Sequence, residues 1–205
     1  MNKNNRKEHL YRIAFKLFMT KPFDSVSISD IEKASGMSRG AIVYYGKDKM
    51  GLFYNVVKHY LVNYQNLDNK LNVPRSEYAH YSLKKFIELY VSGAQSTINK
   101  LQSIDPNVKN GSRPYMSLIL QVCQYFPDLN EEYLEDRNKE LLRWIDILQN
   151  AIESKEVRKD IDIINTAKNF MCIFYGKSFL DALVNGLNTV EVKMQMMNLY
   201  KLLKN

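Results

Sequence analysis

The sequence predicts an all-α protein of about nine helices, because apolar residues recur every three or four positions along most of the chain. Glycine and proline, which interrupt helices, number only eight and five among 205 residues. The order of the expected helices divides the chain into a three-helix N-terminal domain, residues 1–50, and a larger helical domain, residues 51–205.

The first helix is expected over residues 5–20. Its apolar face consists of Leu10, Ile13, Ala14, Leu17 and Phe18. Pro22 follows this face, and proline cannot continue a helix because it lacks the backbone donor.

Residues 27–49 read SISDIEKASGMSRGAIVYYGKDK and predict two short helices around a tight turn, followed by the start of a third. Ser27 and Asp30 have the S-x-x-D spacing of a capping box. Gly36 stands where the first short helix must end, and Ser38 can cap the second. A helix, a turn containing glycine and a second helix form the layout of a DNA-binding helix-turn-helix.

The helical period predicts which side of each short helix packs inward. In the first, Ile28, Ile31 and Ala34 form the expected apolar stripe. In the second, Ala41, Ile42 and Tyr45 are expected to anchor the helix, which leaves Arg39, Gly40, Val43 and Tyr44 outside.

These residues resemble the tetracycline-repressor (TetR) family of bacterial regulators. The family pattern runs I-x-x-A-A-x-x-L-F and then T/S-x-x-D-I-A-x-x-A-G-V-S-x-G-x-L-Y-x-H-F-x-S-K-x-x-L. The matching residues, in the same order, are Ile13, Ala14, Leu17, Phe18, Ser27, Asp30, Ile31, Ala34, Gly36, Met37, Ser38, Gly40, Ile42, Lys49 and Leu52. Val43 and Gly46 depart from it, where the family usually has Tyr and Phe.

The resemblance implies a dimeric, ligand-responsive transcriptional regulator, more often a repressor, that binds a near-palindromic operator in double-stranded DNA. The two departures qualify this expectation. Val43 removes a side chain that in such proteins commonly meets a phosphate, and Gly46 removes an aromatic plug at the end of the recognition helix. The alternative is a helical ligand-binding or adaptor protein whose helix-turn-helix no longer binds DNA.

The candidate DNA contacts lie in and around the second short helix. Arg39 can donate two hydrogen bonds to guanine or meet a phosphate. Tyr45 suits either a phosphate contact or packing. Lys49 lies in the first turn of its helix, where its charge opposes the helix dipole, and it is either a phosphate clamp or a solvated lysine. The full candidate set is Ser27, Ser38, Arg39, Gly40, Ala41, Tyr44, Tyr45 and Lys49.

The positive charge of the chain is concentrated at this end. The net charge is +7, and residues 1–55 hold ten Lys and Arg against five acidic residues, so they carry +5 of it. Clustered basic residues are the electrostatic signature of a nucleic-acid-binding surface.

The larger domain is expected to contain long helices over residues 48–71, 76–103, 128–154, 163–185 and 189–203. A loop over 104–114 should precede a helix that is apolar on nearly all sides and therefore buried. The helix over 48–71 would link the two domains. The last two helices, residues 163–203, have too many apolar faces for one monomer to bury, so we expect them to form a four-helix bundle in a homodimer.

The segment 60–174 is rich in Tyr, Phe and Met and contains the only Trp. That a pocket for a small-molecule effector exists there is implied mainly by the family resemblance, and the alternative for each residue is plain core. An effector would act by favouring one position of the helix over 48–71. The candidate ligand-binding residues are Tyr90, Tyr115, Met116, Trp144 and Phe174.

Several classes of function find no support in the sequence. No nucleophile–base pair, paired-carboxylate motif or glycine-rich phosphate loop indicates an enzyme, and no cofactor is expected. Cys123 and Cys172 lack C-x-x-C spacing and are expected to be buried free thiols, with a redox switch as the alternative. The histidines have no metal-ligand spacing. No apolar run approaches the ~20 residues of a membrane span, and the N-terminus lacks a signal peptide, so we expect a cytoplasmic protein.

Overall fold

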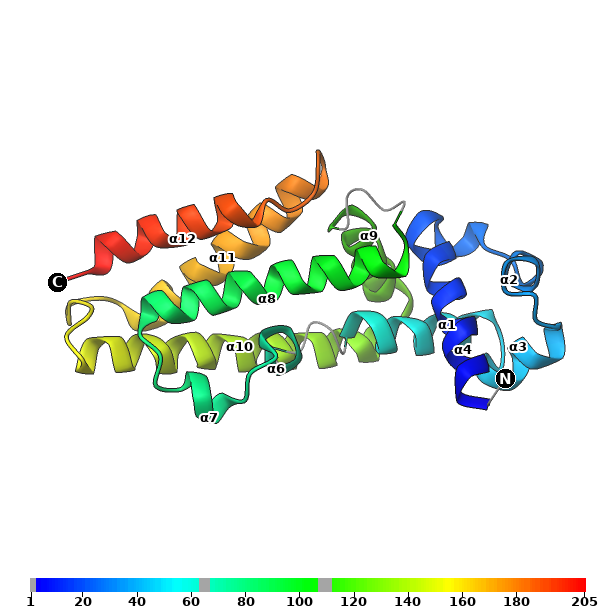
Figure 1. The fold of residues 1–205 in the computed structure, drawn as a ribbon, viewed down its shortest axis with the longest axis horizontal. Helices are drawn as coiled ribbons and strands as arrows, with labels where there is room; N and C mark the ends of the chain where they lie inside the picture. The colour runs from blue at the N-terminus through cyan, green and yellow to red at the C-terminus, as the bar shows by residue number, and fades with distance from the viewer. Residues whose placement is uncertain (1–2, 63–66, 107–111) are drawn as a thin grey trace.

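The computed structural model describes residues 3–62, 67–106 and 112–205, and it confirms the all-α class (Figure 1). Four N-terminal helices form a body at one end, and the remaining helices form an elongated bundle whose C-terminus lies at the other end. In chain order the elements are α1 (Lys3–Thr20), the 3₁₀ turn η1 (Phe23–Ser25), α2 (Ile28–Ser35), α3 (Arg39–Gly46), α4 (Lys49–Val57), the π-helical turn η2 (Lys58–Val62), α6 (Leu67–Leu71), α7 (Arg75–Tyr78), α8 (Leu83–Ile104), α9 (Ser112–Tyr125), α10 (Pro127–Glu153), α11 (Ile163–Ala182) and α12 (Thr189–Leu203).

The helix-turn-helix forms from its local signals as predicted. The Ser27 hydroxyl accepts a hydrogen bond from the Asp30 amide at 3.1 Å, and the Asp30 carboxylate accepts one from the Ser27 amide at 2.9 Å. α2 ends at Gly36, whose φ of +66° favours glycine. The Ser38 side chain caps α3. These caps fix the angle at which α3 leaves α2.

Two helix boundaries differ from the prediction. The helix expected over 76–103 is divided into α7 and α8, because Ser82 caps a new helix and the Glu156 carboxylate accepts hydrogen bonds from the Leu83 and Lys84 amides. α10 begins at Pro127, one residue before the expected start at 128, because proline suits the first position of a helix.

The linking helix expected over 48–71 does not run on as a regular α-helix. α4 passes into the π-helical turn η2, and α6 begins at Leu67. Residues 63–66, including Tyr64, and residues 107–111 of the expected loop lie outside the described residues.

The core of the N-terminal body is closed by a helix from the larger domain. Side chains from α1 to α4, among them Phe18, Ile42 and Phe53, are fully buried in one cluster with Leu118 and Val122 of α9. Of the expected α2 stripe, Ile31 is fully buried and Ile28 packs against the core, but Ala34 is exposed. Ser35 is buried instead, and its hydroxyl is satisfied by donating to the Ile31 carbonyl at 2.6 Å.

A second core lies between α8, α10, α11 and α12, with Trp144 at its centre. The Trp144 ring is fully buried and stacks on Phe170 at a centroid distance of 4.8 Å. Two burial predictions are wrong. α9 is apolar on more sides than it buries, so Leu120 is 64% exposed, and both Cys123 and Cys172 are exposed free thiols.

No helix in the described ranges combines the length and apolar character needed to cross a membrane.

Candidate nucleic-acid interface and ligand pocket

α3 presents a narrow face to solvent. Arg39, Gly40, Val43 and Tyr44 are exposed, with Tyr44 at 64%, whereas Ile42 is fully buried. Because Gly40 has no side chain and a Cβ built there would meet no atom within 4 Å, the middle of this face is open to a close approach. The side chains available to DNA bases and phosphates are therefore Arg39 and Tyr44, and their contact with DNA remains a prediction.

Tyr45 lies on the border between this face and the core. Its side chain is half-buried, and its ring meets the Tyr44 ring edge-on at 5.0 Å. The Asn55 side-chain amide donates to the Tyr45 carbonyl at 3.3 Å, which ties α3 to α4. Of the two roles predicted for Tyr45, these contacts favour packing.

The end of α3 is pressed directly against α4, and this explains Gly46. A Cβ built at Gly46 would lie 2.6 Å from the Cβ of Leu52, and one built at Gly51 would overlap the Gly46 carbonyl oxygen. No side chain fits between the two helices at these points. The position that lacks the family's aromatic residue is thus filled by the α4 backbone and Leu52 instead of being left open.

The Lys49 side chain points toward η1. Its ammonium donates to the Phe23 carbonyl at 3.0 Å and lies 4.1 Å from the centre of the Phe23 ring. The structure therefore gives Lys49 a role in holding η1 against the start of α4. The predicted phosphate clamp requires the same ammonium to reach outward, and it remains a prediction.

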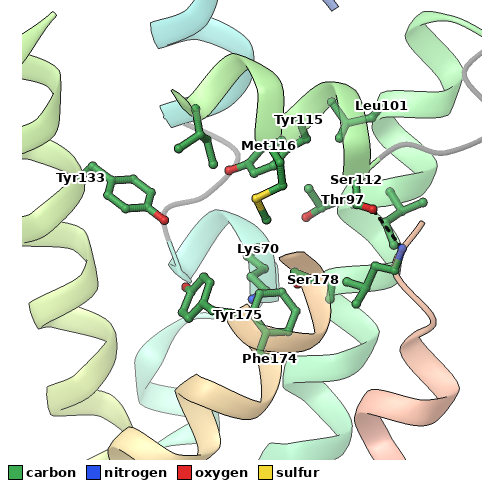
Figure 2. Close-up of a pocket in the computed structure, with 14 residues that line it drawn as sticks. Lys70, Thr97, Leu101, Ser112, Tyr115, Met116, Tyr133, Phe174, Tyr175 and Ser178 are labelled. Atoms are coloured by element: carbon green, nitrogen blue, oxygen red, sulfur yellow. Dashed lines mark hydrogen bonds between the residues drawn. The ribbon is translucent and has the colours of Figure 1, made fainter. Parts of the chain in front are cut away.

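A cavity of about 60 Å³ lies in the larger domain, between α6, α8, α9 and α11, with Tyr133 of α10 at its edge (Figure 2). Most of its wall is apolar. Of the five predicted ligand-binding residues, Tyr115, Met116 and Phe174 line it. Tyr90 and Trp144 are fully buried in the core behind that wall. The sequence thus identified part of the lining together with two residues that support it.

The most unusual residue in the lining is Lys70, which is buried. Its ammonium lies 3.7 Å from the centre of the Tyr90 ring and 3.8 Å from that of Phe174. Burial opposes the charged form and lowers its pKa from 10.5 to about 7. Among the described residues, none accepts a hydrogen bond from this ammonium or forms an ion pair with it.

Glu140 is the buried acid beside it, with 2% of its surface exposed. It accepts hydrogen bonds from the hydroxyls of Tyr90 at 2.5 Å and Tyr175 at 2.6 Å, and it forms an ion pair with Arg137 at 2.7 Å. Burial, followed by the Glu140 charge, raises the pKa of Tyr90 well above its usual value, so this hydroxyl stays a donor. The negative charge of Glu140 is therefore already satisfied by three partners.

Sequence reasoning did not single out Lys70 or Glu140. A signal was present in the spacing. Glu140 precedes Trp144 by one helical turn on the buried stripe of α10, and Lys70 follows Leu67 by one turn on the buried side of α6. A charged residue at a core position is a candidate functional residue.

α9 connects the cavity to the helix-turn-helix. Near its start, Tyr115 and Met116 line the cavity. Near its end, the Gln121 side chain accepts a hydrogen bond from the Phe23 amide at 2.6 Å, and the Tyr125 hydroxyl donates to Asp24 at 2.6 Å. A shift of α9 at the cavity would therefore also move η1, which lies directly before α2.

Comparison with known proteins agrees with this arrangement. Residues 10–56 match the family described as bacterial regulatory proteins, tetR family. The HTH-type transcriptional regulator AcrR of Shigella flexneri is 24% identical over 158 residues, which cover 76% of this chain and 68% of that protein.

Solved structures share the fold over the whole chain. A TetR-family transcriptional regulator from Cytophaga hutchinsonii aligns with a TM-score of 0.67 and 16% identity, over 100% of this chain and 98% of the other. The flavonoid-responsive regulator FrrA aligns with a TM-score of 0.58 and 20% identity, over 97% of this chain and 94% of the other. Proteins of this family are generally DNA-binding regulators and not enzymes. Residues 10–56 thus match the DNA-binding region of the tetR family of bacterial regulatory proteins, and the chain as a whole shares the all-helical fold of solved TetR-family regulators.

Proposed function

We propose that this protein represses transcription as a homodimer bound to a near-palindromic operator, and that a small-molecule effector in the α6–α11 cavity changes its affinity for DNA. The exposed face of α3 is the observation that carries the proposal. The helix is capped and anchored, its exposed face carries Arg39 and Tyr44, and it lies in the part of the chain that holds most of the positive charge.

For DNA contact we assign Arg39 and Tyr44 to bases or phosphates. Around them, the backbone amides at the Ser27 and Ser38 ends of α2 and α3 suit phosphate oxygens, because helix N-termini attract anions. Such a surface reaches the bases only if the helix fits the major groove, and Gly40 and Ala41 keep α3 thin enough for that.

The dimer is supported by the exposed apolar side chains of α11 and α12. Phe179 and Leu180 of α11 and Leu183 directly after it are each more than half exposed, as are Val190 and Met194 of α12. They recur at helical spacing on two adjacent helices, which is the surface that a four-helix bundle between two copies would bury. A two-fold axis there would present two α3 helices to one side of a duplex, in the cytoplasm where the DNA lies.

The effector mechanism follows from the size of the cavity and the contacts of α9. A cavity of about 60 Å³ accommodates only a small group, since drug-sized ligands occupy pockets of about 300 Å³ or more. A larger effector must displace a wall. α9 forms one wall through Tyr115 and Met116, and its far end holds η1 through Gln121 and Tyr125. Effector binding would thereby bias the position of the helix-turn-helix as well as that of α4.

Salt-dependent binding to duplex DNA separates this proposal from the adaptor alternative. We expect the logarithm of the association constant for a labelled duplex to fall linearly with the logarithm of salt concentration between about 50 and 200 mM. The slope should be near −0.9 for each phosphate contacted, because each contact releases counterions. Fluorescence anisotropy of the labelled duplex measures it. An adaptor with a helix-turn-helix that has lost DNA binding would show no such slope.

A further inference from the structure

We propose that the effector is an apolar monocarboxylic acid, whose carboxylate pairs with the ammonium of Lys70 and is also bound by the hydroxyl of Ser178. This inference rests on the proposed function, because it takes the α6–α11 cavity as the effector site, and it adds the chemical class of the ligand.

Among the described charged side chains around the cavity, the Lys70 ammonium is the one that lacks an anionic partner. Glu140 forms hydrogen bonds with Tyr90 and Tyr175 and pairs with Arg137, so its two oxygens are engaged. Lys70 has aromatic faces as its neighbours and no acceptor among the described residues. Buried charges in proteins are normally paired, because removing an ion from water without a partner is costly. A ligand anion would supply the missing partner.

The position of the amine fits this role. Figure 2 shows Lys70 at the cavity beside the Phe174 ring, with Ser178 close by on the same helix as Phe174. Phe174 and Ser178 are one helical turn apart and face the same side of α11, where both line the cavity. The two polar groups therefore converge on one region of the wall.

Ser178 provides the second observation that points to a ligand. The residue is 3% exposed, and its hydroxyl is buried with no hydrogen-bond partner among the described residues. A buried hydroxyl left unsatisfied costs free energy, whereas a carboxylate oxygen can accept its hydrogen bond. A carboxylate has two oxygens and can be bound by the ammonium and the hydroxyl together.

The rest of the wall sets the character of the ligand body. Most of it is apolar, formed by Ala94, Ile98, Leu101, Met116 and Ile119, although Thr97 and Tyr133 also line the cavity. The part of the ligand beyond the carboxylate should therefore be mainly aliphatic or aromatic. A single lysine matches a single negative charge, which favours a monocarboxylate over a doubly charged phosphate ester. Longer acids must displace α9 to enter, and this links the chemistry of the ligand to the response of the protein.

The only tryptophan of the chain provides the readout. Trp144 lies 5.1 Å, ring to ring, from Tyr90, and the Lys70 ammonium lies 3.7 Å from the centre of that Tyr90 ring. Intrinsic fluorescence is titrated with matched pairs of acid and primary amide: hexanoate and hexanamide, octanoate and octanamide, benzoate and benzamide, 2-naphthoate and 2-naphthamide. Each pair keeps the same body and changes only the charged group.

We expect at least one acid to bind about tenfold or more tightly than its amide, because a charge-assisted contact is lost in the amide. Lys70→Met should abolish this preference while leaving amide binding unchanged or tighter. The matched control is Lys85→Met. Lys85 also lies over an aromatic ring, that of Tyr81 at 3.5 Å, but on the exposed surface. The Lys85→Met protein should retain the preference for the acid over the amide.

The inference is overturned if the amides bind as tightly as the acids, if Lys70→Met keeps the preference, or if no acid shows saturable binding. Operator affinity measured on the same samples distinguishes this failure from that of the proposed function. Acids that bind selectively without changing operator affinity would support the ligand class and contradict the effector mechanism. An operator-binding protein that takes no acid would contradict the ligand class alone.

Discussion

Replacing Leu180 with glutamate is expected to convert the protein into a monomer and to lower its operator affinity by about a hundredfold or more. In the isolated chain Leu180 is 60% exposed, so the glutamate is solvated and the fold is retained. In the proposed bundle it would be buried near its own copy across the two-fold axis, and two unpaired carboxylates there are strongly unfavourable. A monomer holds one half-site and loses the gain from binding two sites at once.

The control is the same substitution on another exposed leucine, Leu120→Glu. Leu120 is 64% exposed and lies on α9, outside the two helices of the proposed dimer surface. Light scattering during size exclusion gives the mass of each variant, and anisotropy gives its operator affinity. Leu120→Glu should behave as the unmodified dimer. A Leu180→Glu protein that remains dimeric and binds the operator normally would show that another surface forms the dimer.

Lys70→Met is expected to stabilise the protein, by roughly 3 kcal/mol in the free energy of unfolding at pH 6, which corresponds to a rise in Tm of about 6–12 °C. Methionine fills a similar volume without a charge to bury. The lysine has a folded-state pKa of about 7, below its value of 10.5 in water. At pH values between these two pKa values, the Lys70 side chain is protonated in the unfolded chain and deprotonated in the folded chain.

The stability of the unmodified protein should therefore rise with pH from about 7 to about 10, by up to about 1.4 kcal/mol per pH unit from this group. The gap between Lys70→Met and the unmodified protein is largest at pH 6 and narrows above pH 7. Urea unfolding followed by circular dichroism, at one protein concentration, measures the pH dependence of stability and the difference between the two proteins. Lys85→Met should show neither effect. A Lys70→Met protein that is no more stable at pH 6, or a gap that does not change with pH, would contradict the buried cation.

The local signals in the sequence were sufficient for the DNA-binding end. Capping by Ser27 and Ser38 and the positive φ of Gly36 depend on residues within one turn of each other, so they are readable from spacing alone. The exposure of Arg39 and Tyr44 follows from the helical period of the apolar residues in the same segment. Gly46 could not be understood in this way, because its reason lies in the α4 backbone that packs against it.

The cavity was only partly predictable for a related reason. Aromatic residues such as Tyr115 and Phe174 were selected by type, and type does not distinguish a lining residue from Trp144, which is plain core. Lys70 and Glu140 were overlooked because their burial depends on three or more helices that come together only in the fold. The exposure of Cys172 has the same origin, because which side of α11 is covered depends on how the other helices pack in the fold.

The measurement that tests the regulator most directly is a selection of random duplex DNA on the purified protein, repeated with Arg39→Ala, Lys49→Ala and, as a control, Lys201→Ala at the far end of α12. We predict enrichment of a near-palindromic site. Arg39→Ala should weaken binding to it by about tenfold or more, since one good base contact contributes about 1–3 kcal/mol. Lys49→Ala should weaken it as well, and Lys201→Ala should bind normally. No enriched site, or a site bound equally well by Arg39→Ala, would contradict recognition of DNA through α3.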